Sequence, residues 1–553
     1  MKKTLLSAIV AVAASFAAFG ANENKITCEG AYKRHLQGVA TDGTNIWWSF
    51  TDKISKSDLE GKVLLTVDAP SHQGDCCYHD GKLYVAVNLG KFNTEDKADS
   101  WVYRFDAKTL DLEKKWKVPE LCHGSGGITF ANGDFYVVGG LPPTHTCNYV
   151  YRYSPDFKFK KRYVLKTGYT GLGIQTATFV DGKFYFGCYA GKDHLGNKVA
   201  TCTIVCPEDL SYFRRSKANT SLGLLKLDGK LMAAVGTKYP ADDPVAENRG
   251  KLSAFLKPVD IKIEPLRILA IGNSFTISLM NNKHFQKAIE AAGENIEIAV
   301  MYIGGCPLSR HWQNVEKADN PKFKPYLIVK YDGKENRFNA NIPEMLASAD
   351  WDYVTLQQVS HMSFKPETYE PFTAKLVETI KKACPRAQIV FQQTWAYTTF
   401  GKRIRQVGAE SQEQMYEDLT KAYKAIAKAY DLDVIPTGLA VQLARRARNV
   451  NVPEVTDEDR AKCVYPDLPK IGNDIVGKIY WGKSKKDPSK RVLLGDEIHF
   501  NSTGEYLQAC TWLKFFCPDV DIVNLSYYPE KLLSAEEAKV LRNAAAEAVA
   551  KGL

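Results

Sequence analysis

The chain has 553 residues, which is too long for one hydrophobic core, so we expect two or more domains. Its apolar fraction of 45% and its charged fraction of 25% are typical of a folded globular protein. The formal net charge is +10, and no dense Lys/Arg run with interleaved aromatic residues occurs. This mild, dispersed charge argues against nucleic-acid binding.

The N-terminus has the pattern of a secretory signal peptide over residues 1–21. Lys2 and Lys3 precede a short apolar run at 4–14, and small residues near position 20 offer a cleavage site. The run is too short and Ala-rich to span a membrane, and no later stretch approaches about twenty apolar residues. No cysteine follows the cleavage point to carry a lipid anchor. The sequence therefore predicts a periplasmic or secreted protein without stable membrane insertion.

Thirteen cysteines suit an oxidising compartment, but the number is odd and their pairing cannot be derived from sequence. The closely spaced Cys202 and Cys206 fit disulfides or buried thiols. A metal site at this pair would need a second pair of ligands nearby, and none stands out. We therefore predict no metal and no cofactor.

The N-terminal half contains a repeat in which Asp-Gly or Asn-Gly separates two strand-like runs. This pair favours a two-residue type I′ hairpin turn, because both central residues need positive φ. The turns recur at intervals of roughly 40–50 residues, as in propeller blades. They begin at Asp42, Asp80, Asn132, Asp181 and Asp228. The repeat predicts a β-propeller of about five blades over residues 22–260, with six blades as the alternative.

Polar residues at the starts of the inner strands could either line a central channel or form hydrogen bonds within blades. They are His35, Gln37, His72, Gln73, His123 and Gln175. The propeller could bind a glycan, shape a cleft, or itself be an enzyme. Its acidic residues lie mostly in turns, which makes paired catalytic carboxylates hard to identify.

Near residues 258–265 the pattern changes to alternating apolar strands and amphipathic helices, so we place the domain boundary there. A helical pattern covers 415–426, and a capping box at Ser534 opens a final helix. Strand–helix alternation predicts a parallel sheet covered on both faces over residues 266–553, with ligands at the carboxyl ends of its strands. The strand-like runs are 267–272, 296–302, 353–357, 387–392 and 432–436.

Two segments of this half carry groups suited to nucleophilic catalysis. Ser274 lies in a Gly-Asn-Ser turn after the first strand, and Asp496 and His499 lie three residues apart before a late helix. A hydroxyl becomes a good nucleophile when an imidazole takes its proton, and the imidazole needs a carboxylate on its other nitrogen. Ser274 alone also fits a helix cap, and Asp-x-x-His alone is a common pattern. Together, at these positions, they predict a serine hydrolase.

The segments Gly272-Asn-Ser-Phe275 and Asp496-Glu-Ile-His499 resemble the SGNH (GDSL-type) hydrolase superfamily. The resemblance is to a bacterial branch with Ile-Gly-Asn-Ser-Phe, then Leu-Gln-Gln, then Asp-x-x-His-x-x-x-x-Gly, and it covers about 266–525. It implies a flavodoxin-like α/β/α sandwich and an esterase or carbohydrate O-deacetylase. Ser274 would be the nucleophile, His499 the general base and Asp496 its orienting partner.

Such an enzyme needs preorganised donors around the oxyanion of its intermediate. We expect the backbone N–H of Ser274 and a glycine after the second strand, with Gly304 preferred to Gly305. A third donor would follow the third strand, where the family's commonest pattern is Gly-x-Asn-Asp and this chain has Leu-Gln-Gln. Gln358 is the predicted donor there, and Gln357 is the reserve.

Asn273, Gln357 and Trp395 complete the predicted site as substrate-binding residues. Trp395 and Tyr397 fit either a sugar-stacking surface or the core, and His311 and His361 receive no role. The sequence thus predicts an exported, cofactor-free serine esterase acting on an acylated carbohydrate or another small ester. The alternative is a glycan- or protein-binding propeller protein with a degenerate hydrolase domain.

Overall fold

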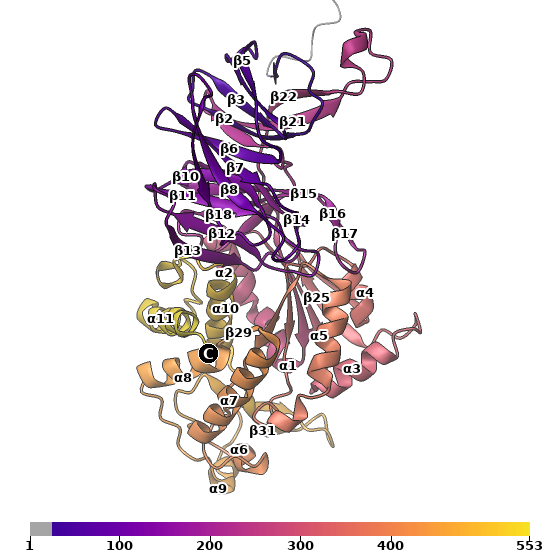
Figure 1. The fold of residues 1–553 in the computed structure, drawn as a ribbon. Coiled ribbons are helices and arrows are strands. Elements are labelled where there is room, and N and C mark those ends of the chain that lie inside the picture. The colour runs from indigo at the N-terminus through magenta and orange to yellow at the C-terminus, as the bar shows by residue number, and fades with distance from the viewer. Residues whose placement is uncertain (1–24) are drawn as a thin grey trace, which may run out of the picture. The chain divides into compact units, whose positions relative to one another are not determined.

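The computed structural model describes residues 25–553, so the predicted signal peptide lies outside the described residues. The chain divides into two compact units, one ending at Glu264 and the other spanning Pro265–Leu553 (Figure 1). Among the helices of residues 25–553, none is both long enough and apolar enough to cross a membrane.

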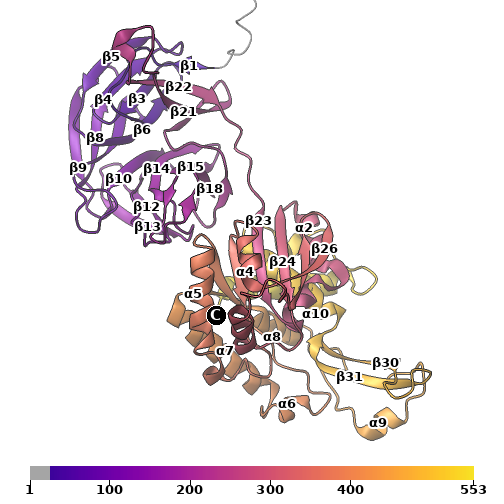
Figure 2. The same cartoon turned by 90° about the vertical axis from the view of Figure 1, so that its right-hand side faces the viewer.

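The first unit contains five four-stranded antiparallel sheets arranged as the blades of a propeller (Figure 2). The prediction of five blades is confirmed. The first three blades are β2 (Leu36–Thr41), β3 (Ile46–Phe50), β4 (Lys53–Ser57) and β5 (Val63–Asp68); β6 (Gln73–His79), β7 (Lys82–Asn88), β8 (Ser100–Asp106) and β9 (Leu112–Lys117); and β10 (Ser125–Ala131), β11 (Asp134–Gly139), β12 (Asn148–Tyr153) and β13 (Phe159–Leu165). The last two are β14 (Gly171–Val180), β15 (Lys183–Tyr189), β18 (Cys202–Pro207) and β19 (Arg214–Ser216); and β20 (Leu224–Leu227), β21 (Lys230–Lys238), β22 (Leu252–Pro258) and β1 (Ile26–Thr27).

The N-terminal strand β1 closes the ring by completing the last blade. It pairs with β22, with Ile26 opposite Leu256 and Thr27 opposite Phe255. The inner strands β2, β6, β10, β14 and β20 each contact the next, and β20 contacts β2. Each blade thereby covers the apolar faces of its neighbours, which a single isolated sheet could not do.

The hairpin prediction holds for four blades and is wrong for the first. In four blades a two-residue loop has positive φ at both positions, as a type I′ turn requires; these loops begin at Asp80, Asn132, Asp181 and Asp228. In the first blade, β2 and β3 are joined by four residues. The carboxylate of Asp42 accepts the backbone N–H groups of Thr44 (2.8 Å) and Asn45 (2.6 Å), so a side chain shapes this turn.

The second unit is built on a seven-stranded sheet in the order β26-β25-β24-β23-β27-β28-β29. The five strands from β24 to β29 in this order are parallel, as predicted, but β25 pairs antiparallel with both β24 and β26. Only residues 332–334 join β25 to β26, and so short a connection permits only a hairpin. The strands are β23 (Leu266–Gly272), β24 (Ile296–Tyr302), β25 (Tyr326–Tyr331), β26 (Glu335–Ala340), β27 (Tyr353–Leu356), β28 (Gln388–Gln392) and β29 (Asp433–Ile435).

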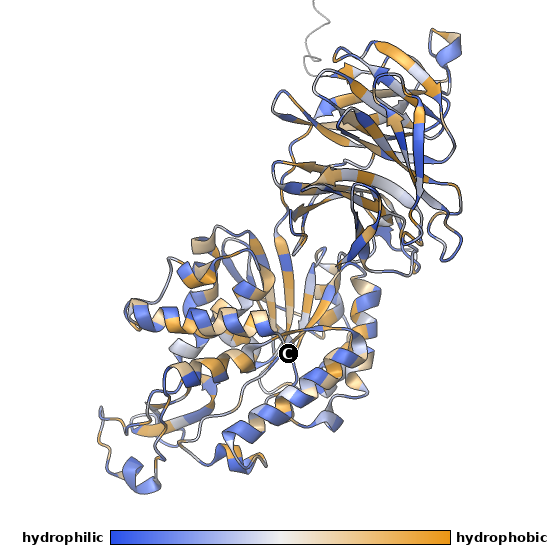
Figure 3. Cartoon of the chain, turned by 60° about the vertical axis from the view of Figure 1, so that its left-hand side comes forward, coloured by the Kyte–Doolittle hydropathy of each residue, from blue (hydrophilic) through white to orange (hydrophobic). Residues whose placement is uncertain are grey.

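Two groups of helices pack in this unit, on either side of the sheet in Figure 1. One group is α2 (His284–Ala292), α8 (Thr437–Ala447), α10 (Ser502–Phe516) and α11 (Ala535–Lys551); the other is α3 (Leu308–Glu316), α4 (Ile342–Ala347) and α5 (Phe372–Ala383). The helix α7 (Gln412–Tyr430) contacts β29. Figure 3 shows mostly apolar strands between helices that carry both polar and apolar faces. The predicted capping box of Ser534 and Glu537 opens α11.

A hairpin of β30 (Val476–Lys483) and β31 (Arg491–Phe500) extends from this unit (Figure 2). The sequence did not predict it. Asp496 and His499 lie near the end of β31, directly before α10, so this hairpin brings them to the unit's central sheet.

Candidate active site

Ser274 lies at a tight turn from the first central strand into a short helix. Strand β23 ends at Gly272, and Asn273 is the N-cap of α1 (Ser274–Ile277), accepting the N–H of Phe275 at 3.1 Å. A Cβ on Gly272 would lie 2.0 Å from Oγ1 of Thr276, so only glycine fits there. The turn therefore places Ser274 at the carboxyl end of β23, where ligands of such sheets bind.

The structure brings Ser274, His499 and Asp496 into one hydrogen-bonded chain. Oγ of Ser274 lies 2.8 Å from Nε2 of His499, although 225 residues separate them. Nδ1 of His499 lies 2.8 Å from Oδ2 of Asp496. The side chains of His499 and Asp496 are 32% and 22% exposed, so the chain is open to solvent at its imidazole.

Asp496 is held as a carboxylate. Burial raises the pKa of Asp496, but the hydrogen bonds from His499 and the electrostatic interaction with it outweigh burial and lower this pKa to about 2. Its Oδ1 accepts the backbone N–H groups of Ile498 and His499, both at 3.1 Å. An ionised acceptor at Nδ1 places the imidazole hydrogen there, which leaves Nε2 free to accept the hydroxyl hydrogen of Ser274.

Aromatic rings pack beneath these residues. Phe275 stacks on Trp395 with centroids 3.9 Å apart, and Trp395 stacks on Phe500 at 3.6 Å. Nε1 of Trp395 donates to the carbonyl of Ile498 at 2.9 Å. Trp395 is fully buried, so its indole supports the loop before His499, and no face is open for a sugar. The substrate-binding prediction for Trp395 therefore fails, and its core interpretation fits.

Tyr397 is also fully buried and hydrogen-bonds to Ser360 at 2.8 Å between hydroxyls. Neither of the two aromatic side chains considered for sugar stacking is therefore exposed at this site.

Asn273 and Gln357, predicted to bind substrate, are instead buried and bonded to the protein. Nδ2 of Asn273 donates to the carbonyl of Cys306 at 3.1 Å, and its Oδ1 accepts Nε2 of Gln357 at 3.1 Å. Oε1 of Gln357 accepts the hydroxyl of Thr276. These bonds hold the turn on both sides of Ser274, which makes both residues positioning residues.

Gln358 does not supply the predicted oxyanion donor. Its side chain is fully buried, and Nε2 donates to the carbonyl (2.9 Å) and hydroxyl (3.2 Å) of Thr368. Oε1 accepts the N–H groups of Leu308 (3.1 Å) and Val359 (2.9 Å). With both amide hydrogens bonded to Thr368, the side chain joins the start of α3 to the loop after β27.

Two backbone segments named in the oxyanion prediction lie at this turn or are bonded to it. The N–H of Ser274 belongs to the first residue of α1 and has no partner within the helix. The loop after β24 is tied to the same turn, because Ile303 donates to the carbonyl of Gly272 at 3.5 Å and Asn273 donates to that of Cys306. Gly304 and Gly305 are exposed in this loop.

Further residues fix the position of His499 without contacting it, and the sequence did not indicate them. Nδ2 of Asn501 donates to the carbonyls of Asp474 (2.8 Å) and Gly477 (3.3 Å), while its Oδ1 caps α10. Glu497 accepts the N–H of Arg403 at 2.7 Å. Both are common polar types whose partners are distant in sequence, so no local pattern marks them.

The two histidines without a predicted role lie in different settings. His311 is fully buried, with Nδ1 2.8 Å from the hydroxyl of Tyr326, and burial lowers its pKa to about 3. His361 is exposed, and partial burial followed by the charge of Arg403 lowers its pKa.

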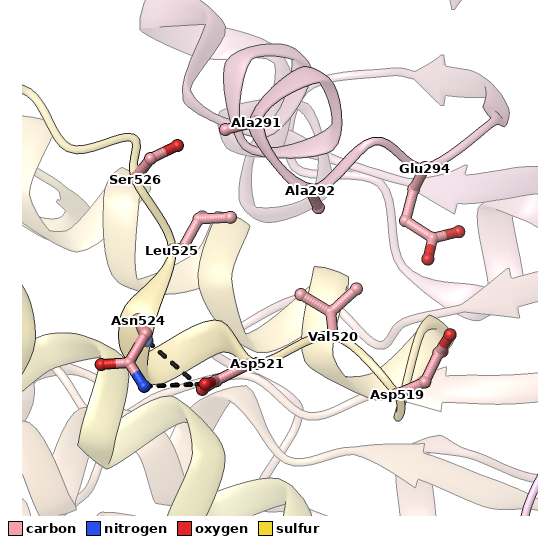
Figure 4. A pocket seen from close by; sticks show the side chains of 9 residues that line it. All are labelled: Ala291, Ala292, Glu294, Asp519, Val520, Asp521, Asn524, Leu525 and Ser526. Atoms are coloured by element: carbon pink, nitrogen blue, oxygen red, sulfur yellow. Dashed lines mark hydrogen bonds between the residues drawn. The ribbon is translucent and has the colours of Figure 1, made fainter.

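Outside the Ser274 site, this unit has a polar pocket of about 460 Å³ between the end of α2 and residues 519–526 (Figure 4). Its lining holds acidic side chains, and Nδ2 of Asn524 donates to Asp521 at 2.7 Å. It contains no nucleophile paired with a base.

Among residues 25–553, no group of three or more His, Cys, Asp or Glu side chains is placed to hold a metal ion. Several cysteines are buried thiols, one of the two states that the sequence allowed: Cys28, Cys76, Cys77, Cys306 and Cys510.

Residues 267–461 match a family described as "Domain of unknown function (DUF4886)". The matched range contains Ser274 and ends before Asp496 and His499. No curated protein matches the sequence.

Three solved structures show weak likeness. A DUF4886 family protein from Bacteroides uniformis ATCC 8492 is 25% identical, with 52% of this chain and 95% of that protein covered and a TM-score of 0.40. A protein of unknown function from Bacteroides caccae is 18% identical, with coverages of 36% and 70% and a TM-score of 0.24. A xylan β-1,4-xylosidase from Bacillus halodurans C-125 is 13% identical, with coverages of 42% and 54% and a TM-score of 0.31. TM-scores below 0.5 do not establish a shared fold. The family match does show that the C-terminal half of this chain contains a DUF4886 domain.

Proposed function

We propose that the C-terminal unit is a serine ester hydrolase, with Ser274 as nucleophile, His499 as general base and Asp496 as its orienting carboxylate. The observation that carries the proposal is the pair of 2.8 Å contacts linking Ser274 to His499 and His499 to Asp496. Helix capping does not account for Ser274, because Asn273 occupies the N-cap position. Among the described residues, this arrangement fits the geometry of an activated hydroxyl.

In the first step, Oγ of Ser274 attacks the ester carbonyl carbon while Nε2 of His499 takes the hydroxyl proton. The carbonyl π electrons move to oxygen, where the N–H of Ser274 and one from the Gly304 segment would stabilise the negative charge. Collapse of this intermediate expels the alcohol, which takes the proton from His499. Water then attacks the acyl-enzyme with His499 again as base, and the carboxylic acid and free Ser274 are released.

The proposed substrate class is an O-acetylated carbohydrate. Support comes from the resemblance of the Ser274 and His499 motifs to the SGNH superfamily, whose members are mostly esterases and carbohydrate O-deacetylases. The five parallel strands lie in the order β24-β23-β27-β28-β29. When they are numbered along the chain without the β25–β26 hairpin, this order is 2-1-3-4-5, the flavodoxin-like order expected for that superfamily. The side chain of His499 is 32% exposed, so a substrate can reach it from solvent.

The test is hydrolysis of p-nitrophenyl acetate and release of acetate from acetylated xylan by the full chain. We expect Ser274→Ala and His499→Ala each to lower kcat by at least about 10³-fold. Ser309→Ala, at a half-buried position on α3, is the matched control and should keep full activity. Undiminished turnover in either triad variant, or no labelling of Ser274 by a fluorophosphonate, would overturn the proposal.

A further inference from the structure

The propeller holds a cavity of about 370 Å³ at the centre of its ring of blades. Its lining residues come from all five blades or from the segments leading into their inner strands, so the cavity lies where the blades meet. Side chains facing it include His35, Gln37, His72, Phe92, Gln175 and Tyr189. Its volume lies within the roughly 300–1,000 Å³ typical of small-ligand sites.

The floor of this cavity is tightly packed, so its shape is preformed. Gly74 and Gly126 both line it, and a Cβ on Gly74 would lie 2.1 Å from the carbonyl oxygen of Gly126. Beside Gly74, the fully buried Asp75 of β6 accepts the N–H of Ala177 of β14 at 2.9 Å. Burial raises the pKa of this carboxyl well above its ordinary value. The bond joins two blades that are not neighbours in the ring and fixes the inner strands.

The lining of the cavity contains no carboxylate, ammonium or guanidinium group. None of the described residues that line it is Asp, Glu, Lys or Arg. Burial, then the nearby His35, lowers the pKa of His72 below its ordinary value, which favours the neutral imidazole. A charged ligand would lose its hydration here without gaining a partner of opposite charge. The chemistry therefore selects a neutral ligand.

Several polar groups of the lining have hydrogen-bonding capacity left. Oδ1 of Asn93 accepts the N–H of Leu141 at 2.9 Å, which leaves its Nδ2 hydrogens to donate. Nε2 of Gln175 donates to the carbonyl of Leu172 at 2.8 Å, which leaves its Oε1 to accept. A ligand rich in hydroxyls can donate and accept at once, and so satisfies both side chains.

Two residues of the cavity hold left-handed backbone, Asn93 (φ 57°) and Leu172 (φ 60°). This region is unfavourable for a branched side chain such as leucine, and such residues cluster at binding sites. Leu172 is 42% exposed, so burial of its side chain does not explain the conformation. The rings of Phe92 and Tyr189 add apolar faces that suit the C–H face of a sugar.

We propose that this cavity binds a neutral carbohydrate, as one terminal sugar or a short end of a glycan. The site is separate from Ser274 and does not depend on ester hydrolysis. Uncharged amides, a neutral imidazole and aromatic rings in one preformed cavity match a neutral ligand with alternating hydroxyl and C–H surfaces.

The test is ligand-observed NMR titration of the full chain with glucose, galactose, mannose, xylose and N-acetylglucosamine. We expect at least one to bind with Kd below about 10 mM, and Phe92→Ala to weaken that binding at least about tenfold. Phe159→Ala, at an exposed phenylalanine on the outermost strand β13, is the matched control and should bind normally. Gln175→Glu, at a half-buried position, provides a second variant in case Phe92→Ala unfolds, and should also weaken binding.

Binding should persist in Ser274→Ala, which separates this proposal from the esterase. Glucuronic acid and glucosamine should bind at least about tenfold more weakly than their neutral counterparts. Absence of binding by all five neutral sugars would overturn the proposal. Equal binding by wild type and both cavity variants would do the same.

Discussion

Nε2 of Gln357 donates to Oδ1 of Asn273 at 3.1 Å, and the same side chain accepts the hydroxyl of Thr276 on Oε1. One buried amide therefore holds the residue before Ser274 and a residue after it. Oε1 of Gln392, at the end of the next strand, β28, lies 3.1 Å from the same hydroxyl and is an alternative acceptor for its one hydrogen. The position of Ser274 thus depends on side chains at the ends of neighbouring strands as well as on its own turn.

Replacing Gln357 by leucine should impair catalysis without removing a group that reacts. We expect Gln357→Leu to lower kcat about 10- to 100-fold with little change in KM, because a misplaced nucleophile mainly affects the reacting geometry. It should also destabilise the unit by about 1–3 kcal/mol, because the buried Oδ1 of Asn273 loses a donor. Gln388→Leu, at the opposite end of β28, is the control. An unchanged kcat in Gln357→Leu would contradict the positioning role.

Gln358→Met distinguishes the structural role of Gln358 from the predicted oxyanion role. Methionine has a similar length but cannot donate to Thr368 or accept from Leu308. We expect a loss of about 1–3 kcal/mol in unfolding free energy, with turnover by the folded enzyme changed less than about tenfold. Chemical denaturation and kinetics below the unfolding transition provide both measurements. If turnover instead fell by about 100-fold or more at unchanged stability, Gln358 would have to be an oxyanion donor.

Asp496→Asn should affect both rate and acid stability. The amide introduced by this substitution can donate a hydrogen to Nδ1 of His499, which places the imidazole hydrogen on Nε2, so we expect Asp496→Asn to lower kcat by on the order of 10³–10⁴. The pKa of Asp496 is lowered from 3.8 to about 2 in the folded protein, which corresponds to about 2 kcal/mol of stability. Since the folded pKa is the lower one, this stability is complete above pH 3.8 and is lost as pH falls through 2.

Denaturation curves of wild type and Asp496→Asn at several pH values measure this contribution. The difference between them should be largest near pH 7 and shrink towards pH 2. A difference that stays constant with pH would show that Asp496 does not gain its stability as a carboxylate.

The fold could be predicted wherever a local rule decides it. The type I′ turns at Asp80 and Asn132 depend on two adjacent residues, so their sequence reveals the blades. The closing strand β1 has only two residues, Ile26 and Thr27, and its partner β22 is more than 200 residues away. A two-residue strand is too short to show a sequence pattern, so the sequence could not indicate that pairing.

The site shows the same division between local motifs and distant contacts. Ser274 and His499 stand in short motifs, one after the first strand and one before a late helix, and these positions suggested the contact that the structure shows at 2.8 Å. The amide directions of Gln357 and Gln358 could not be predicted, because partners such as Thr368 decide where each points. In the sequence, a tryptophan at position 395 fits a sugar-stacking residue and a core residue equally well, and only its burial in the structure distinguishes the two roles.

His284 should make the C-terminal unit sensitive to mild acid. It is buried with Nδ1 2.7 Å from the hydroxyl of Tyr527 and Nε2 3.1 Å from that of Ser502, near the start of α10. Burial, with the nearby charge of Lys287 second, lowers its pKa from 6.5 to about 4. Between these values the unfolded chain binds the proton and the folded unit does not.

The contribution of neutral His284 to the free energy of unfolding is therefore complete above pH 6.5 and falls by about 3 kcal/mol as pH drops to 4. In His284→Gln, an amide can still donate and accept but does not titrate in this range. We expect the Tm of the C-terminal unit, measured by calorimetry, to fall less between pH 7 and 4 in this variant than in wild type. His194→Gln, at an exposed position of the propeller, should follow the wild-type profile. If His284→Gln lost stability with pH as steeply as wild type, another group would have to bind the proton, because the glutamine cannot.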